Sequence, residues 1–310
     1  TDAAVVHKLS TALRQVLEQP ELRQRFESQG NAVRIETPEQ FRTFDHPDRV
    51  KYPHTLRFDA NGDIWYTASM TNHVVRFDPR AGTFEVHDLP TRNWGQWLMA
   101  RAMGPIIWVA NTFKVKGRSV VADPEINPVP YGIDVAPDGR VWFSQFNNSR
   151  LGVITPATGA IEMIDTPFPA PRRFRIDSHG ALWVPSYFDG KFFRFDPVSR
   201  DFREYRLPTG AGDMVYALAI DRRDDTVWLC GTNSDTLIHF DPRTERFSTY
   251  LLPSRVAFTR ELEVDAEGNV WTTTSNLPYY QMEGAQGRVV RLGFRRQAAV
   301  AGAAAESSTP

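Results

Sequence analysis

Six polar or ionisable side chains stand at equivalent positions in six segments of related sequence, each just before a step such as Thr55-Leu56 or Gly132-Ile133. They are His54, Gln96, Tyr131, Arg172, Tyr216 and Arg260. Two of them are arginines and none is acidic. A guanidinium group can hold a carboxylate or phosphate through two parallel hydrogen bonds. The set therefore predicts a binding site for a small anion.

Two histidines are candidate proton carriers, because an imidazole titrates near neutral pH. His54 belongs to the set above, and His73 ends a loop that we expect to open on the same face. Glu261 follows Arg260 directly and is the nearest acid. We therefore predict His54 and His73 as catalytic residues, and Gln96, Tyr131, Arg172, Tyr216, Arg260 and Glu261 as substrate-binding residues. The alternative is that these polar groups only pair with one another or with water in a wet channel.

The segments that carry these residues repeat one pattern. Residues 131–167 read YGIDVAPDGRVWFSQFNNSRLGVITPATGAIEMIDTP, which divides into four short strands separated by polar turns such as Pro137-Asp138-Gly139. Similar copies occupy 53–90, 171–208, 215–253 and 258–294. Four antiparallel strands within about 40 residues are typical of one blade of a β-propeller.

Each copy places a tryptophan in its second strand. These tryptophans are Trp65, Trp108, Trp142, Trp183, Trp228 and Trp271. Sheets that stack radially can bury both faces of one another, which a single sheet cannot do. We therefore predict an all-β fold, a six-bladed β-propeller over residues 45–294, with seven blades as the alternative. The copy around Trp108 is the least regular, so we expect a trimmed blade there.

The chain ends outside the propeller carry different patterns. Apolar residues at helical spacing between 4 and 28 predict a helical arm within residues 1–44. Residues 32–38 (AVRIETP) look like a fourth strand, whereas the last copy stops after its third, so we predict that 32–38 completes the last blade; the alternative is a plain connector. The Ala-rich and then Ser/Thr-rich stretch 295–310 predicts a disordered tail.

Composition limits the partners. The 36 basic and 37 acidic residues nearly balance, which argues against nucleic acid as a partner. No stretch approaches the roughly 20 apolar residues of a membrane span. The single cysteine, Cys230, excludes an internal disulfide. We expect a monomer that binds a small molecule.

The repeated residues resemble the streptogramin B (virginiamycin B) lyases across 45–294, with the gluconolactonase-like propellers as a second relative. Pro53-His54-Thr55-Leu56 matches a strand start of the lyases. The resemblance implies a carbon–oxygen lyase, or a lactone or ester hydrolase, with His54 as the base and Mg²⁺ or another divalent cation assisting. The second strands here end in WYTA, WVAN, WFSQ, WVPS, WLCG and WTTT, so the acid that the lyases carry at this point is not evident.

Two hypotheses of function follow. In the first, the propeller cleaves an ester or lactone bond of a small anionic or cyclic substrate in a central cavity. In the second, it binds a small anion or a protein partner without catalysis. The stretch LRQVLEQPELRQRFESQGNAVRIETPEQF also resembles the C-terminal segment of the periplasmic receptors of tripartite tricarboxylate transporters, which favours a periplasmic or secreted location over a cytoplasmic one.

Overall fold

The computed structural model describes residues 42–113, 127–275 and 287–294, together with a few isolated positions before residue 21. The chain divides into two compact units, Thr1–His46 and Pro47–Pro310. The predicted strand over 32–38 and the tail from 295 lie outside the described residues, as does most of the predicted helical arm. Their assignment stays a prediction. No described helix is both long and apolar enough to span a bilayer.

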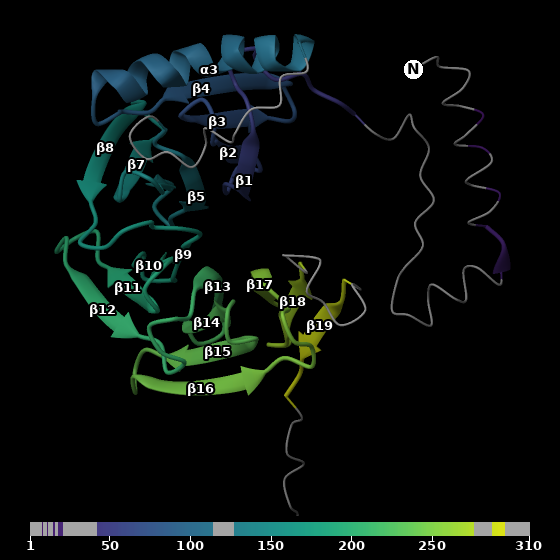
Figure 1. Cartoon of the computed structure of the whole chain (residues 1–310), viewed down its shortest axis with the longest axis vertical. Helices are drawn as coiled ribbons and strands as arrows, with labels where there is room; N and C mark the ends of the chain where they lie inside the picture. The colour runs from purple at the N-terminus through teal and green to yellow at the C-terminus, as the bar shows by residue number, and fades with distance from the viewer. Residues whose placement is uncertain are drawn as a thin grey trace, which may run out of the picture. The chain divides into compact units, whose positions relative to one another are not determined.

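The second unit contains five antiparallel sheets that follow one another around a common centre (Figure 1). The first sheet consists of β1 (Pro53–Phe58), β2 (Ile64–Ala68), β3 (His73–Asp78) and β4 (Thr83–Asp88). The second consists of β5 (Pro130–Val135), β6 (Val141–Gln145), β7 (Arg150–Thr155) and β8 (Ala160–Asp165). The third consists of β9 (Arg175–Ile176), β10 (Leu182–Ser186), β11 (Lys191–Phe195) and β12 (Phe202–Arg206).

The last two sheets continue the same order. The fourth consists of β13 (Val215–Asp221), β14 (Thr226–Gly231), β15 (Thr236–Asp241) and β16 (Arg246–Leu251). The fifth has three described strands, β17 (Thr259–Val264), β18 (Val270–Thr274) and β19 (Val289–Leu292). Contacts run from β1 to β5, β9, β13 and β17 in turn, so the first strand of each sheet lies innermost. The prediction of an all-β propeller with four-stranded blades is confirmed.

The prediction of six or seven blades is wrong, because the described residues form five. The segment around Trp108 is helix α3 (Trp94–Thr112) instead of a trimmed blade. The side chain of Asn93 accepts a hydrogen bond from the Gln96 backbone amide and so caps the helix. Good helix formers then follow as far as Met103, and Pro105 does not end the helix. Trp108 is 66% exposed, unlike the blade tryptophans.

The blade tryptophans fill the space between neighbouring sheets. Trp65, on the first sheet, packs against Ile133 and Phe143 of the second. Trp142, Trp183 and Trp228 likewise lie in clusters with residues of the following sheet, and all four are at most 3% exposed. Trp271, on the fifth sheet, is 40% exposed. Burial of the indole therefore depends on the sheet that comes next in the ring.

A carboxylate in the first hairpin turn holds the indole nitrogen in three sheets. Asp59, Asp177 and Asp265 each accept a hydrogen bond from the tryptophan six residues later, at 3.0, 3.0 and 2.8 Å. In the second sheet this position is Ala136, and the buried Nε1 of Trp142 has no hydrogen-bond partner in the described part of the chain. A buried donor without an acceptor costs stability.

Replacement of the acceptor in the third sheet tests this arrangement. Asp177→Ala leaves the indole of Trp183 without a partner, and also the backbone amides of His179 and Ala181. We expect urea unfolding to show a loss of about 2 kcal/mol. Asp138→Ala, in the exposed turn of the second sheet, is the matched control and should cost less than about 0.5 kcal/mol. Equal losses for the two variants would contradict the role of the carboxylate.

The converse change should stabilise the second sheet. The Ala136 amide donates to the Arg140 carbonyl at 2.9 Å, just as the Asp177 amide donates to the Ala181 carbonyl at 3.0 Å, so the two turns share one geometry. Ala136→Asp supplies the missing acceptor for Trp142, and we expect a gain of about 1 kcal/mol in urea unfolding. A loss of stability would show that the Trp142 indole cannot reach this carboxylate.

Candidate functional site

Four of the residues predicted to converge lie where the innermost strand of their sheet departs from regular strand pairing. In four sheets, two residues of the first strand oppose a single residue of the second, which is a β-bulge. The bulged pairs are His54-Thr55, Tyr131-Gly132, Tyr216-Ala217 and Arg260-Glu261. In the third sheet Pro171 bridges to Ser186 before β9 begins, which leaves Arg172 outside the strand.

Hydroxyl side chains opposite the bulges join the first sheet to the second and the second sheet to the third. Thr67 Oγ1 donates to the Tyr131 carbonyl, and Ser144 Oγ donates to the Arg172 carbonyl, both at 3.0 Å. A Cβ atom on Gly132 would lie 2.4 Å from that Arg172 carbonyl oxygen. Only glycine permits this close approach. The backbone at the centre is therefore fixed by contacts between neighbouring sheets.

Arg172 lies inside an aromatic cluster. Its guanidinium carbon is 3.7 Å from the ring centre of Tyr216, 3.8 Å from that of Tyr187 and 4.5 Å from that of Tyr131. Its Nη2 donates to the Tyr131 hydroxyl at 2.7 Å. The residue is 8% exposed, and its buried Nε has no hydrogen-bond partner among the described residues. The cation is thus held in place with one donor unused.

Two tyrosines extend this cluster to a second arginine. The Tyr131 and Tyr216 hydroxyls are 2.8 Å apart, and Arg260 Nη2 donates to the Tyr216 hydroxyl at 2.6 Å. Burial raises the pKa of Tyr131 to about 12. Burial acts in the same direction on Tyr216, but Arg172 and the hydrogen bonds from Tyr131 and Arg260 outweigh it and lower the pKa of Tyr216. Tyr216 is therefore the more acidic phenol of the pair.

His54 lies beside this cluster. Its ring centre is 4.1 Å from that of Tyr131, and its Nδ1 is 2.9 Å from Thr55 Oγ1. The residue as a whole is exposed, yet the pKa of His54 is lowered to about 4, first by burial of the ring and then by Arg173, Arg172 and Arg260. The imidazole is consequently neutral at pH 7 and can accept a proton.

Glu261 has its carboxylate already paired. Its oxygens accept hydrogen bonds from Arg173 Nη1 at 2.6 Å and from Arg175 Nη2 at 3.3 Å. Burial raises the pKa of Glu261, although both arginines oppose this. Glu261 therefore ties the fifth sheet to the segment that begins the third. Sequence reasoning missed Arg173 and Tyr187; the adjacent pair Arg172-Arg173 is the signal that could have identified the former.

Two predicted site residues lie elsewhere. Gln96 does not begin an inner strand: it is in the first turn of α3, where its side chain exchanges hydrogen bonds with Asn148 at 2.7 and 3.2 Å. His73 begins β3, where its Nε2 is 2.9 Å from Asp88. The centre thus gathers His54, Tyr131, Arg172, Tyr216 and Arg260, with Glu261 at its border. We call these six residues, together with Arg173 and Tyr187, the central cluster.

The magnesium ion that the family resemblance implies does not fit the central cluster. Among the described residues, no group of three or more His, Cys, Asp or Glu side chains is placed to hold a metal ion. The carboxylate of Glu261 is occupied by two arginines, and the surrounding charges are guanidinium groups. Such a site attracts anions and repels a divalent cation.

Comparison with solved structures finds the same fold in streptogramin-cleaving propellers. A streptogramin B lyase has a TM-score of 0.57 at 20% identity, over 78% of this chain and 70% of that chain. A catalytically inactive virginiamycin B lyase from Staphylococcus aureus, solved with quinupristin, has a TM-score of 0.59 at 19% identity, over 75% and 67%. A chain of the nidogen/laminin complex has a TM-score of 0.52 at 12% identity, over 73% of each chain.

No protein-family model matches the chain. No curated protein matches it either. The fold is therefore that of a virginiamycin B lyase-like β-propeller, established by structure alone.

The charge environment of His54 can be tested by NMR titration of the seven histidines, with His54→Gln to assign its signal. We expect a midpoint near pH 4, because burial and the guanidinium groups disfavour the imidazolium. Arg173→Gln should raise the midpoint, but not to the ordinary value of 6.5, since burial is the larger cause. Arg203→Gln, on the outer strand β12, should leave it unchanged. Titration of His54 near 6.5 in the parent protein would contradict the proposed environment.

Proposed function

We propose that the central cluster binds a small anionic or cyclic ester or lactone and that His54 cleaves its carbon–oxygen bond as a general base. One observation carries the proposal: a neutral imidazole lies beside fixed guanidinium groups. A base must be unprotonated to act, and a departing carboxylate must be stabilised. The central cluster supplies both, and the same fold in streptogramin-cleaving proteins supports this choice of substrate class.

The proposed reaction is an elimination across the ester bond. Neutral His54 takes a proton from the carbon next to the carbon that bears the ester oxygen. The electrons of that C–H bond form a carbon–carbon double bond, and the carboxylate leaves with the electrons of the C–O bond. Arg260, which is exposed, and Arg172 would stabilise the leaving carboxylate. The carboxylate needs no proton to leave, and no step requires a metal.

Substrate binding also strengthens the base. A pKa of about 4 makes free His54 a weak base, and three nearby cations contribute to that value. A bound carboxylate offsets those cations, so it raises the pKa of His54 toward the reaction pH. For a substrate that carries a carboxylate besides its ester, binding thus strengthens the base.

Non-catalytic anion binding is the second candidate, and one observation favours it. Arg172 and Tyr216 are buried, and the guanidinium of Arg172 stacks on the Tyr216 ring. Such a rigid arrangement suits recognition without turnover. The two functions differ in whether a substrate bond breaks.

A screen of esters, lactones and cyclic depsipeptides, read by mass spectrometry, tests the catalytic function. Elimination opens a cyclic ester without a change in mass, whereas hydrolysis adds one water. We expect His54→Gln to lower turnover by about 100-fold or more while substrate binding survives. Arg260→Gln should raise KM by about tenfold through loss of a charged hydrogen bond. EDTA should have no effect.

His179→Gln is the matched control, because His179 is exposed in the turn between β9 and β10 and should leave turnover unchanged. Activity that survives His54→Gln, or that EDTA abolishes, would refute the assignment of the base. Saturable binding of an ester with no product at any enzyme concentration would favour the non-catalytic function.

A further inference from the structure

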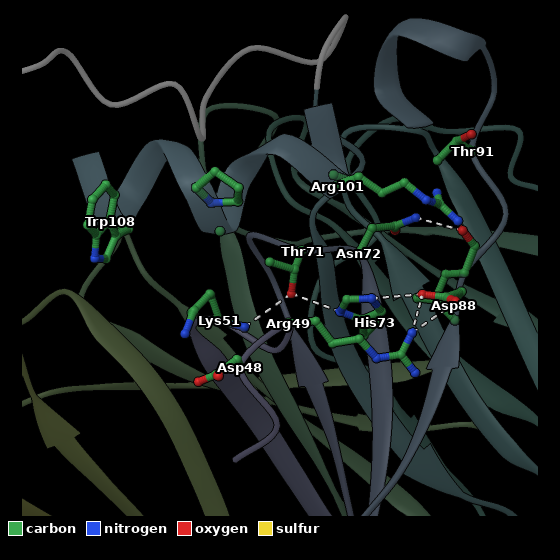
Figure 2. Close-up of a pocket in the computed structure, with 14 residues that line it drawn as sticks. Asp48, Arg49, Lys51, Thr71, Asn72, His73, Asp88, Thr91, Arg101 and Trp108 are labelled. Atoms are coloured by element: carbon green, nitrogen blue, oxygen red, sulfur yellow. Dashed lines mark hydrogen bonds and ion pairs between the residues drawn. The ribbon is translucent and has the colours of Figure 1, made fainter. Parts of the chain in front are cut away.

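A cavity of about 600 Å³ lies between the first sheet and helix α3 (Figure 2). Its walls come from the segment before β1, the turn between β2 and β3, the end of β4 and one side of α3. No residue of the central cluster lines it. The volume falls within the range of roughly 300–1,000 Å³ that is usual for small-molecule sites.

The floor of this cavity is polar, buried and already hydrogen-bonded. His73 is 7% exposed; its Nδ1 is 2.9 Å from Thr71 Oγ1 and its Nε2 is 2.9 Å from Asp88 Oδ1. Thr71 Oγ1 also accepts from the Lys51 backbone amide at 3.2 Å. Its hydroxyl proton is then directed to Nδ1, and the Nε2 proton to Asp88. The floor is therefore rigid, and His73 is not free to carry protons to a ligand.

The charges around the floor leave an excess of cations. Asp88 lies between His73 and Arg49, and its Oδ2 is 3.3 Å from Arg49 Nη1 (Figure 2). This pairing neutralises Arg49. Lys51 and Arg101 also line the cavity, and neither forms an ion pair with any described residue. The remaining acidic residue in the lining is Asp48, which is exposed.

One wall is apolar and includes an exposed indole. Leu89 contributes from the end of β4, whereas Gly104, Pro105 and Trp108 contribute from α3. Two thirds of the Trp108 surface is open to solvent, so its indole is accessible to a ligand. A Cβ atom added to Gly104 would meet nothing within 4 Å, so the helix leaves room beside this wall.

We propose that this cavity is a second binding site, for a small organic anion with a flat apolar body. Lys51, on the same side of the cavity as Trp108, holds the anionic group, and Trp108 covers the apolar body (Figure 2). Arg101, whose guanidinium stacks on the Trp97 ring at 4.2 Å, adds positive potential from the other side. The polar floor supplies no unpaired carboxylate that would repel the anion. The site is independent of the central cluster and of the reaction proposed for it.

Calorimetric titration of the intact protein with 2-naphthoate tests the proposal, because this probe combines a carboxylate with a flat apolar body. 2-Naphthamide has the same body without the charge, and acetate has the charge without the body. We expect 2-naphthoate to bind about tenfold more tightly than either, because its carboxylate can pair with a cation of the cavity and its ring system can pack on Trp108.

Variants locate the binding. Lys51→Gln should weaken 2-naphthoate binding by about tenfold and Arg101→Gln by a smaller factor, whereas Asp48→Asn should strengthen it by about twofold. Gly104→Leu should weaken binding, because the leucine side chain takes up part of the space beside the apolar wall. Gly104→Ala is its control and should retain binding; both should melt at or above the parental temperature, since glycine is unfavourable inside a helix.

Arg260→Gln separates the two sites, because it alters the central cluster and should leave the affinity of this cavity unchanged. The proposal is wrong if 2-naphthoate gives no binding heat, if 2-naphthamide binds equally well, or if affinity responds to Arg260→Gln instead of the cavity variants. Should Gly104→Leu fail to fold, the Lys51 and Arg101 variants decide the matter by themselves.

Discussion

The β-bulge at the start of four of the five inner strands is the constraint on which the central cluster depends. A regular strand would keep His54, Tyr131, Tyr216 and Arg260 in register with the ladder; the bulge inserts one extra residue and redirects the side chain. Hydrogen bonds from Thr67 and Ser144 to the carbonyls of the next sheet then fix the bulged backbone. Blade geometry and site geometry are thus set by the same contacts.

The central cluster concentrates positive charge between a buried part, with Arg172 and Tyr216, and an exposed part, with His54 and Arg260. Arg172 is packed among tyrosine rings, Arg173 pairs with Glu261 but still acts on His54, and Arg260 is hydrogen-bonded to the Tyr216 hydroxyl. Burial and then the guanidinium groups lower the pKa of His54, whereas Arg172 and the hydrogen bonds from Tyr131 and Arg260 lower the pKa of Tyr216 against burial. A ligand carboxylate would reverse both effects, so the charge of the ligand and the reactivity of the site are coupled.

Helix α3 gives the first sheet a feature that the other sheets lack in the described part of the chain. It covers the end of β4 and forms one wall of the cavity. The molecule therefore carries two cationic sites of different construction. The central site is built from strand bulges on several sheets, whereas the second is built from one sheet and one helix.

The sequence by itself determined the blade pattern, because apolar alternation, turn residues and the recurring tryptophans act within about 40 residues. The repeat alignment also identified five residues of the central cluster, namely His54, Tyr131, Arg172, Tyr216 and Arg260. The structure corrected the expected strand at Trp108 and Gln96 to a helix, since two local signals, a capping Asn93 and a run of helix formers, outweigh a weak strand pattern. It also decided that His73 is bound to Asp88, and that Arg173 reaches Glu261, because these contacts join residues distant in the chain or in separate sheets.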